Sequence, residues 1–117
     1  IKKYYDLQII KSITIGTQAD CKKIEKYNNL DYILFDRKPN ANQLPGGNAL
    51  KFDWNIIKNI KIKKNWFLSG GINQENVREA INFLNPYGID ISSGVEDRPG
   101  IKNIDKIINL KKIIDLK

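Results

Sequence analysis

Histidine and methionine are absent from the sequence, and cysteine occurs once, at Cys21. Without histidine, the chain by itself can form neither a Ser-His-Asp triad nor a Cys-His nucleophile pair. The same absence, together with a single thiol, excludes metal sites built on clusters of histidine and cysteine. A single cysteine also has no partner for a disulfide within the chain. We therefore expect no metal site of this kind.

Long apolar runs are also lacking. No segment approaches the ~20 consecutive apolar residues that cross a bilayer, and no apolar N-terminal segment indicates a secretory signal. The 117 residues, 41% hydrophobic and 28% charged, are typical of one soluble globular domain. We expect a cytoplasmic protein without a membrane partner. Because a complete translated chain begins with methionine, we also expect either a processed N-terminus or, as the motifs below favour, a fragment.

The net charge of +7 raises the question of a nucleic-acid partner. Seventeen of the 20 basic residues are lysine, and they are spread along the chain. Arginine forks and aromatic stacking platforms, which specific nucleic-acid binders use, are not evident. We predict a solvated basic surface and no nucleic-acid partner.

Four apolar, β-rich runs alternate with helical patterns, at residues 7–15, 32–35, 66–68 and 89–92. Capping residues predict helices that begin near Thr17, Asp53, Asn73 and Asn103. The third predicted helix has apolar positions at Val77, Ala80, Ile81 and Leu84, and the last at Ile104, Ile107, Ile108, Ile113 and Ile114. Residues 37–47 form a long loop with the composition of a functional loop.

This order predicts an α/β fold with parallel strands and crossover helices. Two architectures are compatible with it, a small doubly wound sheet and part of a TIM (β/α)₈ barrel. A complete barrel needs about 250 residues, so four strand–helix units in this length make half of one.

Polar and glycine residues follow the strands at their carboxyl ends, where both architectures bind ligands. Asp36 ends the second strand, Ser69-Gly70-Gly71 the third, and Ser92-Ser93-Gly94 the fourth. Singly these are ordinary turn residues. Together, at the same place on successive units, they indicate a ligand site in which backbone N–H groups and a following short helix hold a phosphate. Asp90 shares the polar face of the last strand with Ser92, and a carboxylate inside a barrel is costly unless it is paired or used.

The same residues carry a resemblance to a known family. Leu44-Pro45-Gly46-Gly47-Asn48, followed by Phe52-Asp53-Trp54, resembles the loop-and-helix signature of phosphoribosylanthranilate isomerases. Further matches in the same order are Leu68 to Ile72, Glu75-Asn76-Val77, Asp90 to Glu96, and Pro99 to Lys102. The ordered set is specific and covers essentially the whole chain. It implies that residues 1–117 are the C-terminal half of such a barrel, strands five to eight.

The resemblance implies an Amadori rearrangement of an aminoaldose to an aminoketose in tryptophan biosynthesis, without cofactor or metal. By resemblance, Asp36 matches the general acid that opens the ribose ring, and Asp90 matches a carboxylate that contacts the substrate. Gly70, Gly71, Ser92, Ser93 and Gly94 match the phosphate site. The family's general base, a cysteine in a Cys-Gly motif on strand one, has no counterpart here, because Cys21 lies in a helical pattern and is expected to be a partly buried structural thiol.

The sequence departs from the family pattern at three points, and two alternative functions remain open. Ala49-Leu50-Lys51 replaces the more usual glycine and threonine of the loop, Asn103 stands where the family usually has aspartate, and the arginine of the N-terminal half is missing. Another phosphate-binding barrel, such as an indole-glycerol-phosphate synthase, is one alternative. A non-catalytic half-barrel that binds phosphorylated ligands or self-associates is the other, because its interior face, with Leu34 and Leu68, is expected to stay uncovered.

Overall fold

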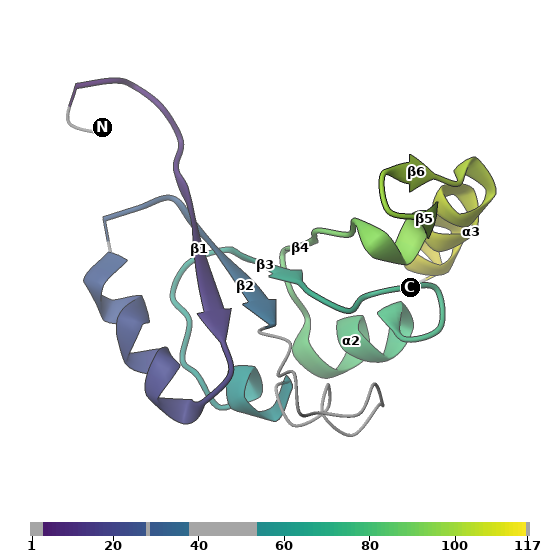
Figure 1. Ribbon diagram of the computed structural model, residues 1–117. Coiled ribbons are helices and arrows are strands. Elements are labelled where there is room, and N and C mark those ends of the chain that lie inside the picture. The colour runs from purple at the N-terminus through teal and green to yellow at the C-terminus, as the bar shows by residue number, and fades with distance from the viewer. Residues whose placement is uncertain (1–3, 28, 38–53, 117) are drawn as a thin grey trace.

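A computed structural model describes residues 4–27, 29–37 and 54–116. Its central sheet has four parallel strands, which lie side by side in chain order (Figure 1). They are β1 (Ile10–Ile15), β2 (Tyr32–Arg37), β3 (Trp66–Ser69) and β4 (Gly88–Ile89). The predicted parallel α/β fold is confirmed.

Helical segments follow each strand. They are η1 (Gln18–Tyr27), a helical turn at residues 54–58, α2 (Val77–Leu84), η2 (Ser93–Val95) and α3 (Ile104–Asp115). A short antiparallel hairpin, β5 (Glu96–Arg98) with β6 (Ile101–Lys102), precedes α3. Figure 1 shows this hairpin and α3 grouped at one end of the molecule. The hairpin was not predicted; a turn at Pro99 and Gly100 joins its strands.

Several boundaries differ from the sequence prediction. β1 begins at Ile10 instead of residue 7, and the segment before it runs away from the body with exposed Tyr4, Tyr5 and Leu7 (Figure 1). β2 continues through Asp36, because Thr14 and Ser69 extend the pairing on either side. β4 has only two residues, paired with Phe67 and Leu68. The predicted strand at 89–92 was therefore wrong beyond Ile89.

Some predictions lie outside the described residues. These are the loop beyond Arg37, its residues Ala49, Leu50 and Lys51, and the cap at Asp53. The helical turn that follows is described, and Trp54, Ile56 and Ile57 are buried in it.

A side chain caps α3 and another holds the turn that begins η1, whereas α2 and η2 begin without a side-chain cap. Asp20 Oδ2 accepts hydrogen bonds from the backbone N–H groups of Gly16 and Thr17, each at 2.9 Å, in keeping with the helix start predicted near Thr17. Asn103 Oδ1 accepts from the Lys106 N–H at 3.0 Å and so caps α3 as predicted. Asn73 Oδ1 accepts from the N–H groups of Glu75 and Asn76, in the turn before α2.

The core lies between one face of the sheet and the helical segments. Ile13, Phe35 and Leu68 are register partners across three strands and are at most 3% exposed. They pack with Ile24 of η1, with Trp54 and Ile57, and with Val77, Ala80 and Leu84 of α2. Burying a side chain of this size stabilises the fold by about 2 kcal/mol.

This register corrects one prediction. Leu68 was expected on the uncovered interior face, but it pairs with Phe35 on the helix-covered face and is 1% exposed. Leu34 is the register partner of Phe67 and belongs to the opposite face, which we call the open face. At the amino end of that face the rings of Tyr32, Phe67 and Tyr87 lie in mutual contact, with centroids 5.6–5.9 Å apart.

The predicted last helix is present as α3, and its apolar residues differ in burial. Leu110 is its buried residue, and Ile113 and Ile114 are partly buried. Ile104, Ile107 and Ile108 are exposed, because α3 follows the hairpin and packs against α2 and η2.

Candidate active site at the carboxyl ends of the strands

A row of polar side chains crosses the open face where the strands end. Thr14, Asp36 and Ser69 are register partners on β1, β2 and β3. Each directly follows a residue buried on the other face, so their side chains point to the open face. Asp90 comes directly after β4, and Ser69 Oγ donates a hydrogen bond to its Oδ2 at 3.3 Å. The structure therefore brings the predicted Asp36 and Asp90 into one row.

Sequence reasoning missed Thr14 and Ser69 as members of this row. Ser69 belongs to the Ser69-Gly70-Gly71 turn, of which only the two glycines were predicted as site residues. Thr14 alternates with Ile13 and Ile15, which was the available signal for its face.

Gly70 lets the backbone approach Asp36 closely. Its φ is +87°, a conformation that side chains disfavour, and a Cβ placed there would lie 2.9 Å from Asp36 Oδ1 and 2.8 Å from the Arg37 nitrogen. Gly71 also has a positive φ of 72°. The carboxyl group of Asp36, which is half-buried, thus lies against the loop that leaves β3.

The loop after β4 packs on the loop after β3. A Cβ at Gly94 would lie 2.0 Å from the Ile72 carbonyl oxygen, so only glycine allows this contact between two backbones. Asn76 Nδ2 donates to the Gly71 carbonyl at 2.7 Å and fixes the first loop. The five predicted phosphate residues, Gly70, Gly71, Ser92, Ser93 and Gly94, therefore lie on two touching loops.

Two details of the predicted site are corrected. Asp90 and Ser92 do not share a strand face, because β4 ends at Ile89; Asp90 is held by Ser69, and Ser92 contacts Lys102. The short helix expected after these loops is the single turn η2.

Cys21 is not part of this row. It lies in η1, is half-buried and packs against the core from the helical side. Burial, with a smaller contribution from the Asp20 carboxylate, raises the pKa of its thiol. The thiol is therefore protonated at neutral pH, in keeping with the structural role predicted for it.

The described part of the chain shows neither a metal-binding cluster nor a membrane-spanning helix. No group of three or more His, Cys, Asp or Glu side chains there is arranged to hold a metal ion. Among those same residues, no helix has the length and apolar character needed to cross a membrane.

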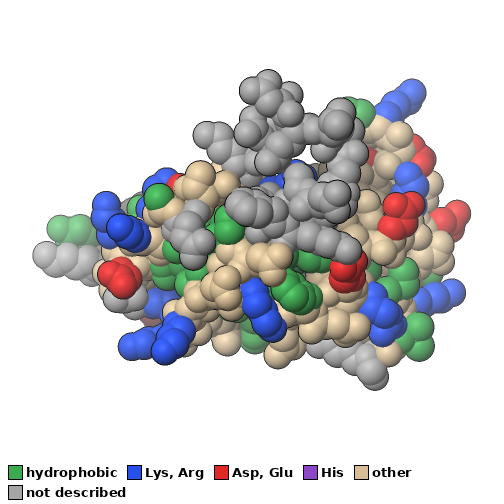
Figure 2. All heavy atoms as spheres, turned by 90° about the horizontal axis from the view of Figure 1, so that it is seen from below, with side chains coloured by type: hydrophobic (Ala, Val, Ile, Leu, Met, Phe, Trp, Pro, Cys, Tyr) green, Lys and Arg blue, Asp and Glu red, His purple; other side chains and the backbone are tan. Residues whose placement is uncertain are grey.

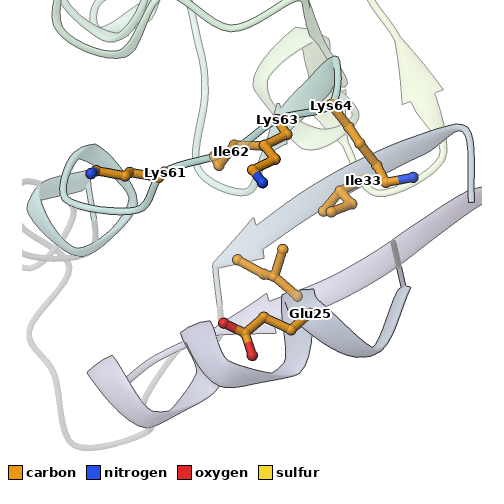
Figure 3. Close-up of a pocket in the computed structure, with 7 residues that line it drawn as sticks. Glu25, Ile33, Lys61, Ile62, Lys63 and Lys64 are labelled. Atoms are coloured by element: carbon orange, nitrogen blue, oxygen red, sulfur yellow. The ribbon is translucent and has the colours of Figure 1, made fainter. Parts of the chain in front are cut away.

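Positive charge is spread over the molecule. Figure 2 shows lysine and arginine side chains around the rim of one face and not gathered in a single patch. A hollow of about 600 Å³ lies between η1 and residues 61–64, and Lys61 and Lys63 line it over Ile33 (Figure 3). Because Ile33 faces the helix-covered side, this hollow is separate from the polar row on the open face.

The comparison with family models decides the relationship. Residues 1–112 match the model of N-(5'phosphoribosyl)anthranilate (PRA) isomerase. The chain belongs to the PRA isomerase family. The resemblance found in the sequence motifs is thereby confirmed.

Individual PRA isomerases agree with this assignment. The chain is 44% identical over 106 residues to N-(5'-phosphoribosyl)anthranilate isomerase of Agrobacterium fabrum, covering 89% of this chain and 48% of that protein. The solved structure of the Thermotoga maritima PRA isomerase superimposes with a TM-score of 0.77 at 32% identity, covering 97% of this chain and 54% of that one.

A third relative was crystallised with a ligand. A PRA isomerase in complex with reduced 1-(o-carboxyphenylamino)-1-deoxyribulose 5-phosphate superimposes with a TM-score of 0.67 at 29% identity, covering 98% of this chain and 53% of that one. The chain thus spans about half the length of the PRA isomerases it matches.

Proposed function

We propose that residues 1–117 form the C-terminal half of a PRA isomerase barrel and carry its general acid and phosphate site. The reaction is the Amadori rearrangement of N-(5-phosphoribosyl)anthranilate to 1-(2-carboxyphenylamino)-1-deoxyribulose 5-phosphate, in tryptophan biosynthesis. The observation that carries this proposal is the position of Asp36, on the open face and against the Gly70 backbone. A substrate whose phosphate sits on the glycine loops would extend over that face.

Asp36 acts as the general acid. Its carboxyl group protonates the ribose ring oxygen, the ring opens, and the anthranilate nitrogen forms a Schiff base with the sugar. Asp90 contacts the substrate beside it, held in place by Ser69. The phosphate is bound by the N–H groups and hydroxyls of Gly70, Gly71, Ser92, Ser93 and Gly94.

A base must then remove a proton from the carbon next to the imine. Cys21 does not serve, because its thiol lies on the helical side of the sheet and its pKa is raised. We infer that the base, like the family's Cys-Gly cysteine, comes from the half of the barrel that this chain does not match. We expect no cofactor or metal, and we expect the enzyme to work in the cytoplasm on its soluble substrate.

A chimera tests this proposal. The part of the Agrobacterium fabrum isomerase that the chain does not match would be fused ahead of residues 1–117, and the product assayed with phosphoribosylanthranilate. We expect turnover by the chimera and none by the chain alone, since general base catalysis contributes about 10²–10⁴-fold and half of the pocket is missing.

The Asp36→Asn chimera tests the acid. The amide keeps the shape of the side chain but has no proton to give to the ring oxygen, so kcat should fall by about 10²-fold or more. Asp115→Asn, at an exposed carboxylate at the end of α3 that pairs with Lys111, is the matched control and should leave kcat unchanged. If Asp36→Asn retains more than about a tenth of kcat, Asp36 is not the acid; full activity of the chain alone would remove the need for a second half.

Of the alternatives raised by the sequence, the indole-glycerol-phosphate synthase is not favoured, because the matched family model is that of PRA isomerase. Self-association of the half-barrel is a second proposal. It is supported by the apolar part of the open face, where Tyr87 is 61% exposed next to Phe67 and Tyr32.

A further inference from the structure

Lys102, at the end of β6, reaches back to the loop after β4. Its ammonium nitrogen lies 3.1 Å from both the carbonyl oxygen and the hydroxyl oxygen of Ser92. It also forms a salt bridge of 3.2 Å with Glu96 Oε2. Three oxygens therefore surround an ammonium group that has three N–H donors and no acceptor.

The contact with Lys102 restricts the direction in which the Ser92 hydroxyl can donate a hydrogen bond. A hydroxyl has one donor and two acceptor positions. Since the Ser92 oxygen accepts from Lys102, its own proton must point elsewhere, and Ser92 is exposed to solvent on the loop assigned to phosphate. Contact with the positive charge also polarises the O–H bond and makes it a better donor to an anion.

The orientation of the Ser92 carbonyl group is fixed by the same lysine. Its oxygen accepts from Lys102 and from the Val95 N–H at 3.3 Å. A carbonyl oxygen directed at a phosphate would repel it, whereas one engaged with an ammonium group is kept from doing so. One lysine thus orients both oxygens of the same residue.

The hairpin holds Lys102 in this position. Glu96, whose side chain is only 12% exposed, accepts from the Gly100 N–H at 2.8 Å through the same oxygen that binds Lys102. Gly100 makes the turn with a φ of +84°. On the other side, Lys106 Nζ donates to the Glu96 carbonyl at 2.8 Å and pairs with Asp97 at 3.3 Å.

We propose that Lys102 is a positioning residue for the phosphate site, because it turns the Ser92 hydroxyl toward a bound phosphate and turns the carbonyl away. The inference rests on the proposed phosphate site but adds a residue outside the loops that form it. It makes the β5–β6 hairpin part of the binding machinery and not only a link to α3.

The test is titration of the chain with inorganic phosphate, followed by ³¹P and amide NMR, for wild type, Lys102→Met, Lys102→Arg and Lys111→Met. Lys111 pairs with Asp115 on exposed α3, so its replacement removes the same charge far along the chain from the loop. We expect Lys102→Met to weaken phosphate binding about tenfold, the usual effect of losing a charged hydrogen bond. Lys102→Arg should restore most of the affinity, and Lys111→Met should match wild type.

A double-mutant cycle separates positioning from a general structural role. Ser92→Ala should weaken binding in the wild type but change it little in the Lys102→Met background, since the hydroxyl is then no longer oriented. Additive losses, or wild-type affinity in Lys102→Met, would overturn the role of Lys102 and leave the proposed phosphate site standing. No phosphate binding by the wild type at millimolar concentration would overturn both. If Lys102→Met does not fold, Lys102→Gln takes its place in the cycle.

Discussion

One carboxylate oxygen of Asp20 accepts three hydrogen bonds. Oδ2 accepts from the N–H groups of Gly16 and Thr17 and from the Thr17 hydroxyl. The backbone bonds from Gly16 and Thr17, in that order, lower the pKa of Asp20 to about 2. The turn between β1 and η1 therefore depends on the ionised form of this side chain.

We predict that Asp20→Ala destabilises the fold by about 1 kcal/mol at neutral pH, as removal of a helix cap does. Because the folded pKa lies below the unfolded value of about 3.9, the stabilisation is complete above about pH 4 and is lost as the pH falls toward 2. Urea unfolding followed by circular dichroism at several pH values measures this. Asp20→Asn keeps an accepting oxygen, so it should cost less than alanine and should not show this pH dependence. Equal stability of wild type and Asp20→Ala at neutral pH would contradict the prediction.

At the scale of single residues, the sequence predicted that Asp36 and Asp90 lie at the carboxyl ends of neighbouring strands, but it did not predict the side chains beside them. Asp36 could be placed because it follows an apolar run, and Asp90 because it was polar where a strand was expected. Leu68 was placed on the wrong face, because the face of a strand depends on its register with the next strand. That register is not visible in one strand's own pattern.

Among the elements, α3 carries a cap whose chemistry depends on the hairpin before it. Asn103 Oδ1 accepts from the Lys106 N–H, while Asn103 Nδ2 donates to both carboxylate oxygens of Asp97, at 3.0 and 3.1 Å. This bond to Asn103, and then Lys106, lowers the pKa of Asp97. An aspartate at position 103 could cap the helix equally well but would face the Asp97 carboxylate. The presence of asparagine where the resemblance expects aspartate thus has a local reason.

We predict that Asn103→Ala lowers stability by about 1 kcal/mol through loss of the cap. Asn103→Asp should also be destabilising in the wild type, yet nearly neutral when Asp97 is replaced by alanine, because the repulsion is then gone. Thermal unfolding of the four variants of this cycle gives the coupling. An identical effect of Asn103→Asp with and without Asp97 would show that the two side chains are independent.

The strand–helix alternation was visible in the sequence because each apolar run is bounded by capping or turn residues. The hairpin was missed because its strands have three and two residues, too few for an alternating pattern. The isoleucines of α3 were recognised in the sequence only as its apolar positions. The helix turns them to solvent because it packs on α2 and η2 and not on the sheet. The burial of the α3 isoleucines therefore depends on the position of the helix in the folded chain, which its own sequence pattern does not contain.

For the molecule as a whole, the open face is the feature that most affects behaviour in solution. One face of the sheet is filled by helical side chains, while the other carries Leu34, Phe67 and the polar row. β1 and β4 are the outer strands of this sheet, so within the described part of the chain each has one side without a neighbouring strand. Unpaired strand edges and exposed apolar surface both promote association.

We predict that the isolated chain forms dimers or larger assemblies at tens of micromolar, as measured by sedimentation equilibrium. The charge of +7 is too strongly screened at physiological salt to prevent apolar pairing. Leu34→Lys should weaken association, because it places a charge on the open face. Ile104→Lys, on exposed α3, is the matched control and should have little effect. A monomeric wild type would contradict the prediction, and equal effects of the two substitutions would assign association to another surface.

The short length of β4 also affects how often the backbone opens locally at the end of the sheet. Asp90 is joined to the sheet by its N–H bond to the Leu68 carbonyl at 2.8 Å, directly after a strand of only two residues at the sheet's edge. Thr14, Asp36 and Ser69 lie instead on strands that pair over four to six residues. Local opening of such an edge requires far less free energy than global unfolding, so the Asp90 amide should exchange its hydrogen for deuterium well before those of Phe35 and Leu68. We therefore expect the backbone that carries Asp90 to open more often than the backbone that carries Thr14, Asp36 and Ser69.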